Sequence, residues 1–321
     1  MRVTALAIVL SGALVTGCGT EPEPPAGEAA PAPEYPAEAA GTALPDVIVA
    51  ERGGFIPEGV EYDRTNDRIL TGSLSEGSVL QLHPDGRVTT VVTDEDLVSS
   101  VGIEVDELRN RLLVANSDRT VFEGTSAGQA ELAVYDLTSG DRIALIDLAA
   151  TVSDPDATHL ANDAAVSDDG TVYVTDTMFN AIYRVTPEYE ASLLHKFEDT
   201  AGGPNGIEVH PDGYLLVARG AELWKVPMSD PGASASVSLA EPVPGGDGIV
   251  WSAGRLVIVS NSDSRVVALT STDDWTTAEV AGVATFDTAA TTAAVVDDEV
   301  YVVHPVFEGD DPPSVSRVTF H

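Results

Sequence analysis

The chain is poor in cysteine and in basic residues. Cys18 is the only cysteine among 321 residues, which excludes an intramolecular disulfide. Lysine and arginine together number 16, against 52 aspartates and glutamates, and the net charge is −36. Such a field repels nucleic acid and anionic membrane surfaces, so we expect neither as a partner of the folded chain. Because the acidic residues are spread along the whole sequence, solubility is a simpler explanation of the charge than attraction of cations.

The N-terminal apolar run is too short to cross a membrane. Residues 3–15 follow Met1-Arg2 and fall below the roughly 20 residues that a spanning helix needs. The run ends in Val15-Thr16-Gly17-Cys18, which resembles the lipobox of bacterial lipoproteins. The resemblance implies a signal peptide at 1–17, a lipid on Cys18, and attachment to the bacterial cell surface or to the periplasmic side of a membrane. The lipid is the only membrane contact that we expect.

Helical periodicity is also missing from the rest of the chain. Residues 18–43 are rich in Pro, Glu and Ala and have almost no large apolar side chains, which predicts a disordered spacer after the lipidated cysteine. From residue 44 to residue 321, short runs of Val, Ile, Leu and Tyr alternate with Gly, Asp, Asn and Pro turns. This pattern predicts an all-β domain over 44–321.

One motif recurs along this domain. A polar residue precedes a glycine or small residue, a short apolar strand, a tight turn and a second strand, and the unit repeats every 42–45 residues with one longer gap. Insertions at about 117–130 and 149–160 account for that gap. Six four-stranded units predict a six-bladed β-propeller. The last unit lacks a strand, and residues 46–50 supply one, so the N-terminal strand is expected to close the ring. Two tandem sandwiches would leave the period unexplained.

The polar residues that open the units carry the prediction of a site. The first strand of each propeller blade lies beside the central axis, so the six opening residues should form a ring: Glu58, Val101, Asn162, Asn205, Asp247 and Thr292. Four of them are oxygen donors, and two carboxylates held close together are costly to bury unless a cation pairs with them. The all-oxygen set favours Ca²⁺ over zinc or copper, although another divalent cation would fit. The alternative is that these side chains only hydrogen-bond the strand ends.

These motifs are similar to those of a known family. Pro57-Glu58-Gly59, Asn162-Asp163, Pro204-Asn205-Gly206 and Asp247-Gly248 resemble, blade by blade, the metal-binding positions of the gluconolactonase and senescence-marker-protein (regucalcin) propellers. Diisopropyl-fluorophosphatase and the paraoxonases are relatives of that family. The resemblance covers about 46–321. It implies a catalytic calcium on the four side chains, Asp247 as base or nucleophile, and hydrolysis of a small-molecule lactone or (phospho)ester.

The sequence departs from the family at two substrate-binding positions. Leu160 stands where many gluconolactonases carry an arginine that grips a sugar hydroxyl. Thr292 stands where the fluorophosphatase-like enzymes carry a histidine, with His304 on a nearby loop. The sequence therefore favours neither substrate class, and a hydrophilic sugar lactone is less expected than in a typical member.

The loops between second and third strands should form the walls of a pocket. The residues expected there are Leu74, Arg119, Phe122, Met178, Phe179, Arg219, Asn261, His304 and Phe307. Arg219 would either donate to a developing oxyanion or pair with a nearby acid. We expect His159 to be solvated and Asp176 to cap its turn.

Three other interpretations remain to be weighed. Residues 124–128 fit the G-x-S-x-G pattern but lack the strand and helix of a nucleophile elbow, so the match is attributed to chance. A non-catalytic propeller lipoprotein that binds a ligand or a protein would fit the anchor and spacer equally well. A metal-free member similar to strictosidine synthase would lack the acidic ligand set, which is intact here.

Overall fold

The computed structural model describes residues 44–198 and 202–321. The predicted signal peptide, Cys18 and the spacer at 18–43 lie outside the described residues. Within them, no helix has the length and apolar character needed to cross a membrane. The regular secondary structure of the described residues is almost entirely strand, as the sequence pattern predicts.

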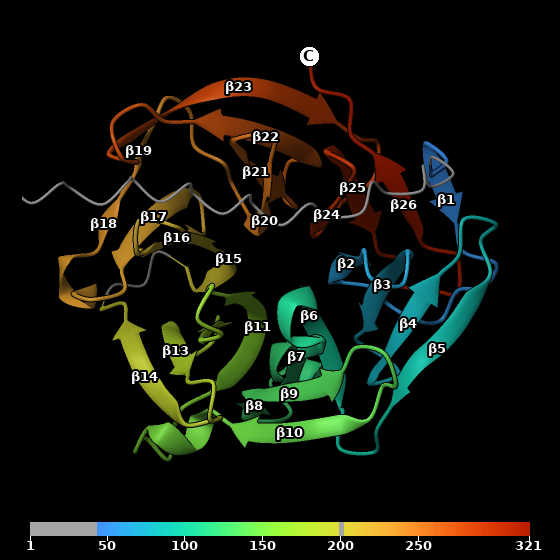
Figure 1. Ribbon diagram of the computed structural model, residues 1–321, viewed down its shortest axis with the longest axis horizontal. Helices are drawn as coiled ribbons and strands as arrows, with labels where there is room; N and C mark the ends of the chain where they lie inside the picture. The colour runs from blue at the N-terminus through green and yellow to red at the C-terminus, as the bar shows by residue number, and fades with distance from the viewer. Residues whose placement is uncertain (1–43, 199–201) are drawn as a thin grey trace, which may run out of the picture. The chain divides into compact units, whose positions relative to one another are not determined.

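Six antiparallel sheets stand in a ring, each a blade whose strands follow one another from the axis outward (Figure 1). Blade 1 comprises β2 (Val60–Asp63), β3 (Arg68–Ser73), β4 (Ser78–Leu82) and β5 (Val88–Thr93). Blade 2 comprises β6 (Ser99–Asp106), β7 (Arg111–Ser117), β9 (Glu131–Asp136) and β10 (Arg142–Asp147). Blade 3 comprises β11 (His159–Val166), β12 (Val172–Asp176), β13 (Ala181–Val185) and β14 (Ala191–Lys196).

The second half of the ring repeats this order. Blade 4 comprises β15 (Pro204–His210), β16 (Tyr214–Arg219), β17 (Glu222–Pro227) and β18 (Ala235–Ser236). Blade 5 comprises β20 (Gly246–Ser252), β21 (Arg255–Ser260), β22 (Arg265–Thr270) and β23 (Thr277–Thr285). Blade 6 comprises β24 (Ala293–Val296), β25 (Glu299–His304), β26 (Ser314–Arg317) and β1 (Val47–Val49). The prediction of a six-bladed propeller is confirmed.

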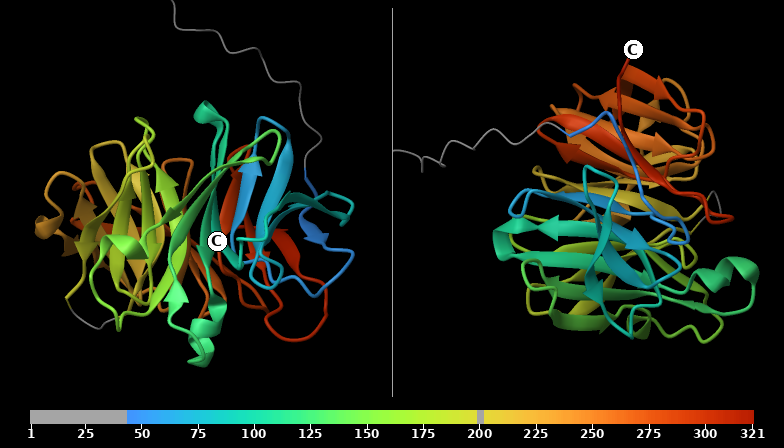
Figure 2. Two further views of the ribbon diagram at one scale, coloured as in Figure 1. Left: turned by 90° about the horizontal axis from the view of Figure 1, so that it is seen from below. Right: turned by 90° about the vertical axis from the view of Figure 1, so that its right-hand side faces the viewer.

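Two short strands extend blades 3 and 5, and short 3-10 helices lie in the connections. Strand β8 (Gly128–Gln129) pairs in parallel with β11, and β19 (Ser238–Leu239) pairs in parallel with β23. The 3-10 helices are η1 (Glu107–Arg109), η2 (Arg119–Glu123), η3 (Ala149–Thr151) and η4 (Pro231–Ala233). Helix η2 and β8 occupy the first predicted insertion, and η3 opens the second. In the side views of Figure 2, the connections between strands gather at the two faces of the ring.

Strand β1 closes the ring as predicted. It lies antiparallel to β26, with Ile48 opposite Val315. The pleat turns Ile48 inward, where it is 1% exposed, and leaves Val47 and Val49 each 55% exposed. The first strand of the described chain thereby completes the last blade. Strand β26 is paired on both sides, with β25 and with β1, so it is not an edge strand.

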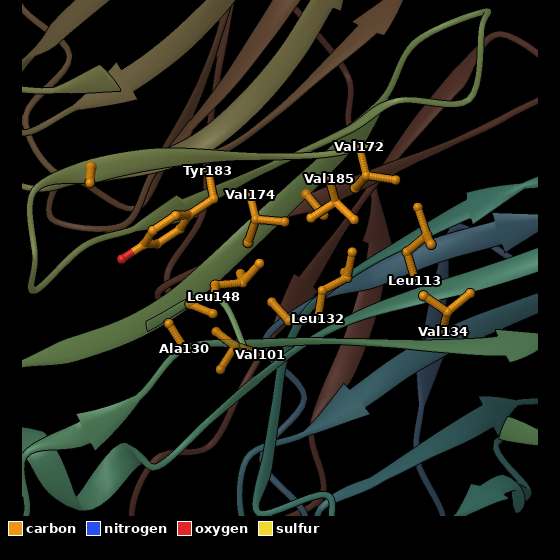
Figure 3. Packing of buried hydrophobic residues seen from close by; sticks show 14 of the residues in the cluster. Val101, Leu113, Ala130, Leu132, Val134, Leu148, Val172, Val174, Tyr183 and Val185 are labelled. Carbon is orange, nitrogen blue, oxygen red and sulfur yellow. The ribbon is translucent and has the colours of Figure 1, made fainter. Parts of the chain in front are cut away.

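The core lies between neighbouring blades. Figure 3 shows the cluster between blades 2 and 3, where Val101 and Leu132 of one blade meet Val174 and Tyr183 of the next. Further clusters of the same kind join the other blades. Because both faces of a blade are covered in this way, the middle strands read as continuous apolar runs and not as alternating ones.

Candidate functional site

A cavity of ≈ 250 Å³ opens where the inner strands of the blades begin. Its lining brings together all four of the oxygen-bearing residues predicted to converge: Glu58, Asn162, Asn205 and Asp247. They come from blades 1, 3, 4 and 5, so only closure of the ring can place them side by side. The remaining lining residues that the structure describes are Leu74, Val101, Arg119, Phe122, Leu160, Asn261, Thr291 and Phe307.

Close packing at the axis explains why glycine follows three of the polar residues. A Cβ atom on Gly59 would stand closer than 3.0 Å to the Val101 carbonyl of the next blade. Gly206 and Gly248 would meet Asp247 and Thr292 in the same way. The inner strands therefore approach so closely at the axis that only glycine fits, and this approach brings the preceding polar side chains within reach of one another.

Threonine hydroxyls from neighbouring strands hold the site in place. Thr177 Oγ1 accepts a hydrogen bond from Asn162 Nδ2 at 2.9 Å and donates one to the Pro204 carbonyl at 2.7 Å. Thr175 Oγ1 donates to the Asn205 carbonyl at 2.7 Å. Thr291 Oγ1 donates to the Glu58 carbonyl at 2.8 Å. The amide nitrogen of Asn162 is bound to Thr177, and its carbonyl oxygen accepts no hydrogen bond from a described residue.

The two carboxyl groups of the cavity are nearly removed from water. Glu58 is 9% exposed and Asp247 is 7% exposed. Burial above all, and then the charge of Asp163, raise the pKa of Asp247 to about 8, against the neighbouring Asn205 and Asn261 amides, which lower it. Burial, followed by the charges of Asp247 and Asp163, raises the pKa of Glu58 well above its usual range. Two adjacent carboxylates cannot both ionise here without a compensating positive charge.

This arrangement fits a hard divalent cation. Asp247 Oδ1 is buried and has no hydrogen-bond partner among the described residues, so it is free to coordinate an ion. Within the same residues, no three histidine, cysteine or carboxylate side chains cluster as a metal site. The donors in the cavity are instead two carboxylates and two amides, an all-oxygen set that suits calcium or magnesium and not zinc.

A narrower acidic channel runs next to the cavity along the axis. Its free volume is ≈ 20 Å³, and its acidic lining residues are Glu58, Glu61, Glu104, Asp163 and Glu208. Burial raises the pKa of Glu61 to about 8 and that of Asp163 to about 7, and it holds the pKa values of Glu104 and Glu208 well above their usual range. This channel was not predicted from the sequence.

A signal for the channel was present in the repeats. Glu61, Glu104 and Glu208 each stand three positions after the residue that opens their unit, in blades 1, 2 and 4. If the repeats are aligned position by position beyond the opening residue, the third position therefore shows a second group of carboxyl side chains.

The pocket wall is only partly as predicted. Leu74 and Phe122 line the cavity, as do Arg119, Asn261 and Phe307. Met178, Phe179, Arg219 and His304 are not among the described residues that line it. Met178 is 37% exposed on a loop, and Phe179 packs in the core with its ring 4.9 Å from that of His159.

Arg219 and His304 are missing from the wall for a shared reason. Both end the second strand of their blade, a position that lies buried between blades and not at the axis. Arg219 is 0% exposed, with its guanidinium 4.5 Å from the centre of the Phe197 ring. His304 Nδ1 lies 3.0 Å from the Ala289 carbonyl. Neither side chain is therefore found where the sequence predicted it, among the described residues that line the cavity.

His159 is buried and not solvated. It is 8% exposed, and its Nδ1 lies 2.7 Å from Asp176 Oδ2. Asp176 Oδ1 accepts hydrogen bonds from the backbone N–H groups of Leu160 and Phe179 at 2.8 and 2.9 Å. Asp176 thus caps its turn as predicted, and the pair also secures the start of β11, three residues before Asn162.

Fold and site together define a class of protein: six-bladed propellers with an axial pocket of carboxylate and amide oxygens. The sequence model of the SMP-30/gluconolactonase/LRE-like region matches residues 56–303. The chain belongs to this family. No curated protein matches the sequence.

Solved structures share the fold at low identity. The major allergen Mala s 1 of Malassezia sympodialis has a TM-score of 0.69 and 17% identity, with 86% of this chain and 97% of the other covered. A gluconolactonase of Xanthomonas campestris has a TM-score of 0.59 and 15% identity, with coverage of 87% and 99%. Virginiamycin B lyase of Staphylococcus aureus has a TM-score of 0.56 and 12% identity, with coverage of 85% and 98%. These similarities establish the fold alone.

Proposed function

We propose that this protein is a calcium-dependent hydrolase of lactones or (phospho)esters. The observation that carries the proposal is the buried Asp247 carboxyl, whose Oδ1 has no partner among the described residues, beside Glu58 and two amide side chains. Membership of a family that includes gluconolactonases supports lactonase-type hydrolysis. The lipid anchor predicted at Cys18 remains part of the proposal and would hold the enzyme at a membrane surface.

The roles of the residues follow from their positions. Glu58, Asn162, Asn205 and Asp247 would hold the ion, and a bound calcium would polarise the carbonyl or phosphoryl oxygen of the substrate. Asp247 would either attack the reacting carbon or phosphorus, with the ester oxygen as the leaving group and water later releasing the acyl or phosphoryl group, or take a proton from the water that attacks and displaces the ester oxygen. The Asn205 and Asn261 amides lower the pKa of the Asp247 carboxyl group and so favour its ionised form. The apolar wall would exclude water from the rest of the substrate.

Calorimetry on metal-stripped protein tests the ion. We expect one calcium site in the wild type and a loss of most of its affinity in Asp247→Asn, because the substitution removes a charged ligand and keeps the shape. Asp212→Asn, in the exposed turn after β15, is the matched control and should bind calcium like the wild type. Failure of the wild type to bind a divalent cation would favour the non-catalytic binding propeller instead.

Turnover is the second test. Lactones, aryl esters and phosphotriesters should be screened with calcium present and again with a chelator. We expect Asp247→Asn to lower kcat by at least about a hundredfold with an unchanged melting temperature, since it removes the base or nucleophile. Undiminished turnover in this variant would remove Asp247 from the chemistry.

A further inference from the structure

Arg119 brings a positive charge to a pocket whose other described lining residues are apolar, neutral polar or acidic. The cavity is lined by Leu74, Val101, Phe122, Leu160 and Phe307 on its apolar side and by the oxygen-bearing residues on the other. Arg119 is the one lysine or arginine among the described lining residues. Neither the calcium ligands nor the proposed hydrolysis requires this cation, so its presence calls for a separate explanation.

The segment that carries Arg119 is built into the fold. Asp118 caps η2, since its Oδ1 accepts hydrogen bonds from Thr120 N at 3.0 Å and Thr120 Oγ1 at 2.7 Å. Val121 is 5% exposed and anchors the helix in the protein. Strand β8 then pairs with β11, beside Leu160. The insertion is therefore tied to the inner strand of blade 3 at one end and capped at the other, which holds Arg119 and Phe122 at the cavity.

The guanidinium group of Arg119 has no partner within the described chain. It donates no hydrogen bond to a described residue and stands within 4.0 Å of no described carboxylate, whereas Arg111 lies 2.6 Å from Asp106 and Arg52 lies 2.8 Å from Glu76. The chain has 52 acidic residues for 16 basic ones, so an arginine can readily find an acid. A half-buried guanidinium left without one is available to an anionic ligand.

We propose that the substrate is an ester or lactone with an apolar body and a carboxylate or similar anionic group, bound by Arg119. As a statement about substrate, this rests on the proposed function. The anionic group pairs with Arg119, the apolar body packs on Phe122 and Phe307, and the scissile bond lies at Asp247. A hydroxyl-rich sugar would leave hydroxyl groups unpaired against this wall, where Leu160 offers no hydrogen bond.

The net charge makes the role of Arg119 testable. A protein of charge −36 repels anions, so an anionic substrate needs a local positive charge to bind. Two aryl esters of equal size and different charge make the comparison. They are 4-acetoxybenzoate, which carries a carboxylate, and 4-acetoxybenzamide, which is neutral. The measurement is the ratio of their kcat/KM values, taken on the full-length protein with calcium.

We expect Arg119→Met to lower the benzoate-to-benzamide ratio about tenfold, because methionine keeps the apolar stem and removes the charge. Arg184→Met removes an exposed arginine on β13 and controls for the change in net charge. It should leave the ratio as in the wild type. An equal ratio in the wild type and Arg119→Met, or an equal fall in both variants, would overturn the proposal.

A binding measurement separates this inference from the proposed function. Calorimetry with 4-ethylbenzoate and 4-ethylbenzamide uses ligands that have no scissile ester. Tighter binding of the benzoate that is lost in Arg119→Met supports the inference even if neither ester is hydrolysed, in which case only the hydrolase proposal fails. Hydrolysis of both esters without an effect of Arg119 supports the enzyme and overturns the inference. Absence of benzoate binding to the wild type, with no ester discrimination, also overturns it.

Discussion

At the scale of single residues, the site depends on the hydroxyl group of Thr177, which is not among the described residues that line the cavity. Thr177 links two blades, because it accepts a hydrogen bond from Asn162 and donates one to the Pro204 carbonyl, next to Asn205. One side chain therefore orients the Asn162 amide and also fixes the backbone beside Asn205. Residues of this kind typically change metal affinity by about 10–100-fold when they are removed.

We expect Thr177→Val to weaken calcium binding about tenfold, because the variant keeps the shape of the side chain and loses both hydrogen bonds. Thr177→Ser keeps the hydroxyl and should retain most of the affinity. The measurement is calorimetry at constant pH, together with the melting temperature of each variant. Equal calcium affinity in Thr177→Val and the wild type would mean that the strand backbone alone positions Asn162.

At the scale of elements, the propeller is closed by a three-residue strand. Only Ile48 of β1 is buried, and it packs in the cluster that joins blades 6 and 1 with Val60, Tyr301 and Val315. Because blades 1 and 6 contribute Glu58 and Thr291 to the cavity, closure at the rim also holds the site together.

We predict that Ile48→Ala lowers the free energy of unfolding by about 2–5 kcal/mol, since it removes buried methyl groups and leaves a cavity. Val49→Ala, at a neighbouring exposed position, is the control and should change it by less than about 0.5 kcal/mol. Denaturant unfolding of both variants gives the comparison. Equal effects of the two substitutions would show that β1 contributes little to closure.

At the scale of the whole molecule, the axis collects carboxyl groups from several blades. The pKa of Glu61 is raised from its ordinary value of 4.5 to about 8 because it is buried, and that of Glu208 is raised well above the ordinary range for the same reason. An acid with a raised pKa in the folded state binds more protons there than in the unfolded state. Its contribution to stability is complete below the unfolded pKa and is lost as pH rises through the folded value.

The metal-free protein should therefore lose stability between about pH 5 and pH 8. In the presence of a chelator, we expect the melting temperature to fall over this range. Glu208→Gln should melt higher than the wild type near pH 8, with a much smaller difference near pH 5, because it removes a carboxyl group that is ionised in the unfolded chain near pH 8 and whose ionised form the channel disfavours. Glu279→Gln, exposed on β23, is the control. A melting temperature of Glu208→Gln below that of the wild type near pH 8 would contradict this account.

The fold and the four oxygen-bearing positions could be predicted because each is encoded within one repeat. Gly59, Gly206 and Gly248 stand where the inner strands approach closely. Their spacing is visible in the sequence without any knowledge of the residues across the axis. The spare strand before blade 1 and the incomplete last unit are likewise visible along the chain, and their pairing is confirmed.

The wall of the cavity, the threonine links and the acidic channel were decided by the tertiary structure. Thr291 and Glu58 are 233 positions apart, and no local pattern reveals their hydrogen bond. Arg219 and His304 stand at strand ends where a pocket wall is expected, but the packing of blades buries them between the sheets. Sequence alone determined which residues open each strand. Packing against the neighbouring blade determined which way the side chains at the strand ends point. A side chain can turn between two blades only where the neighbouring blade leaves space for it.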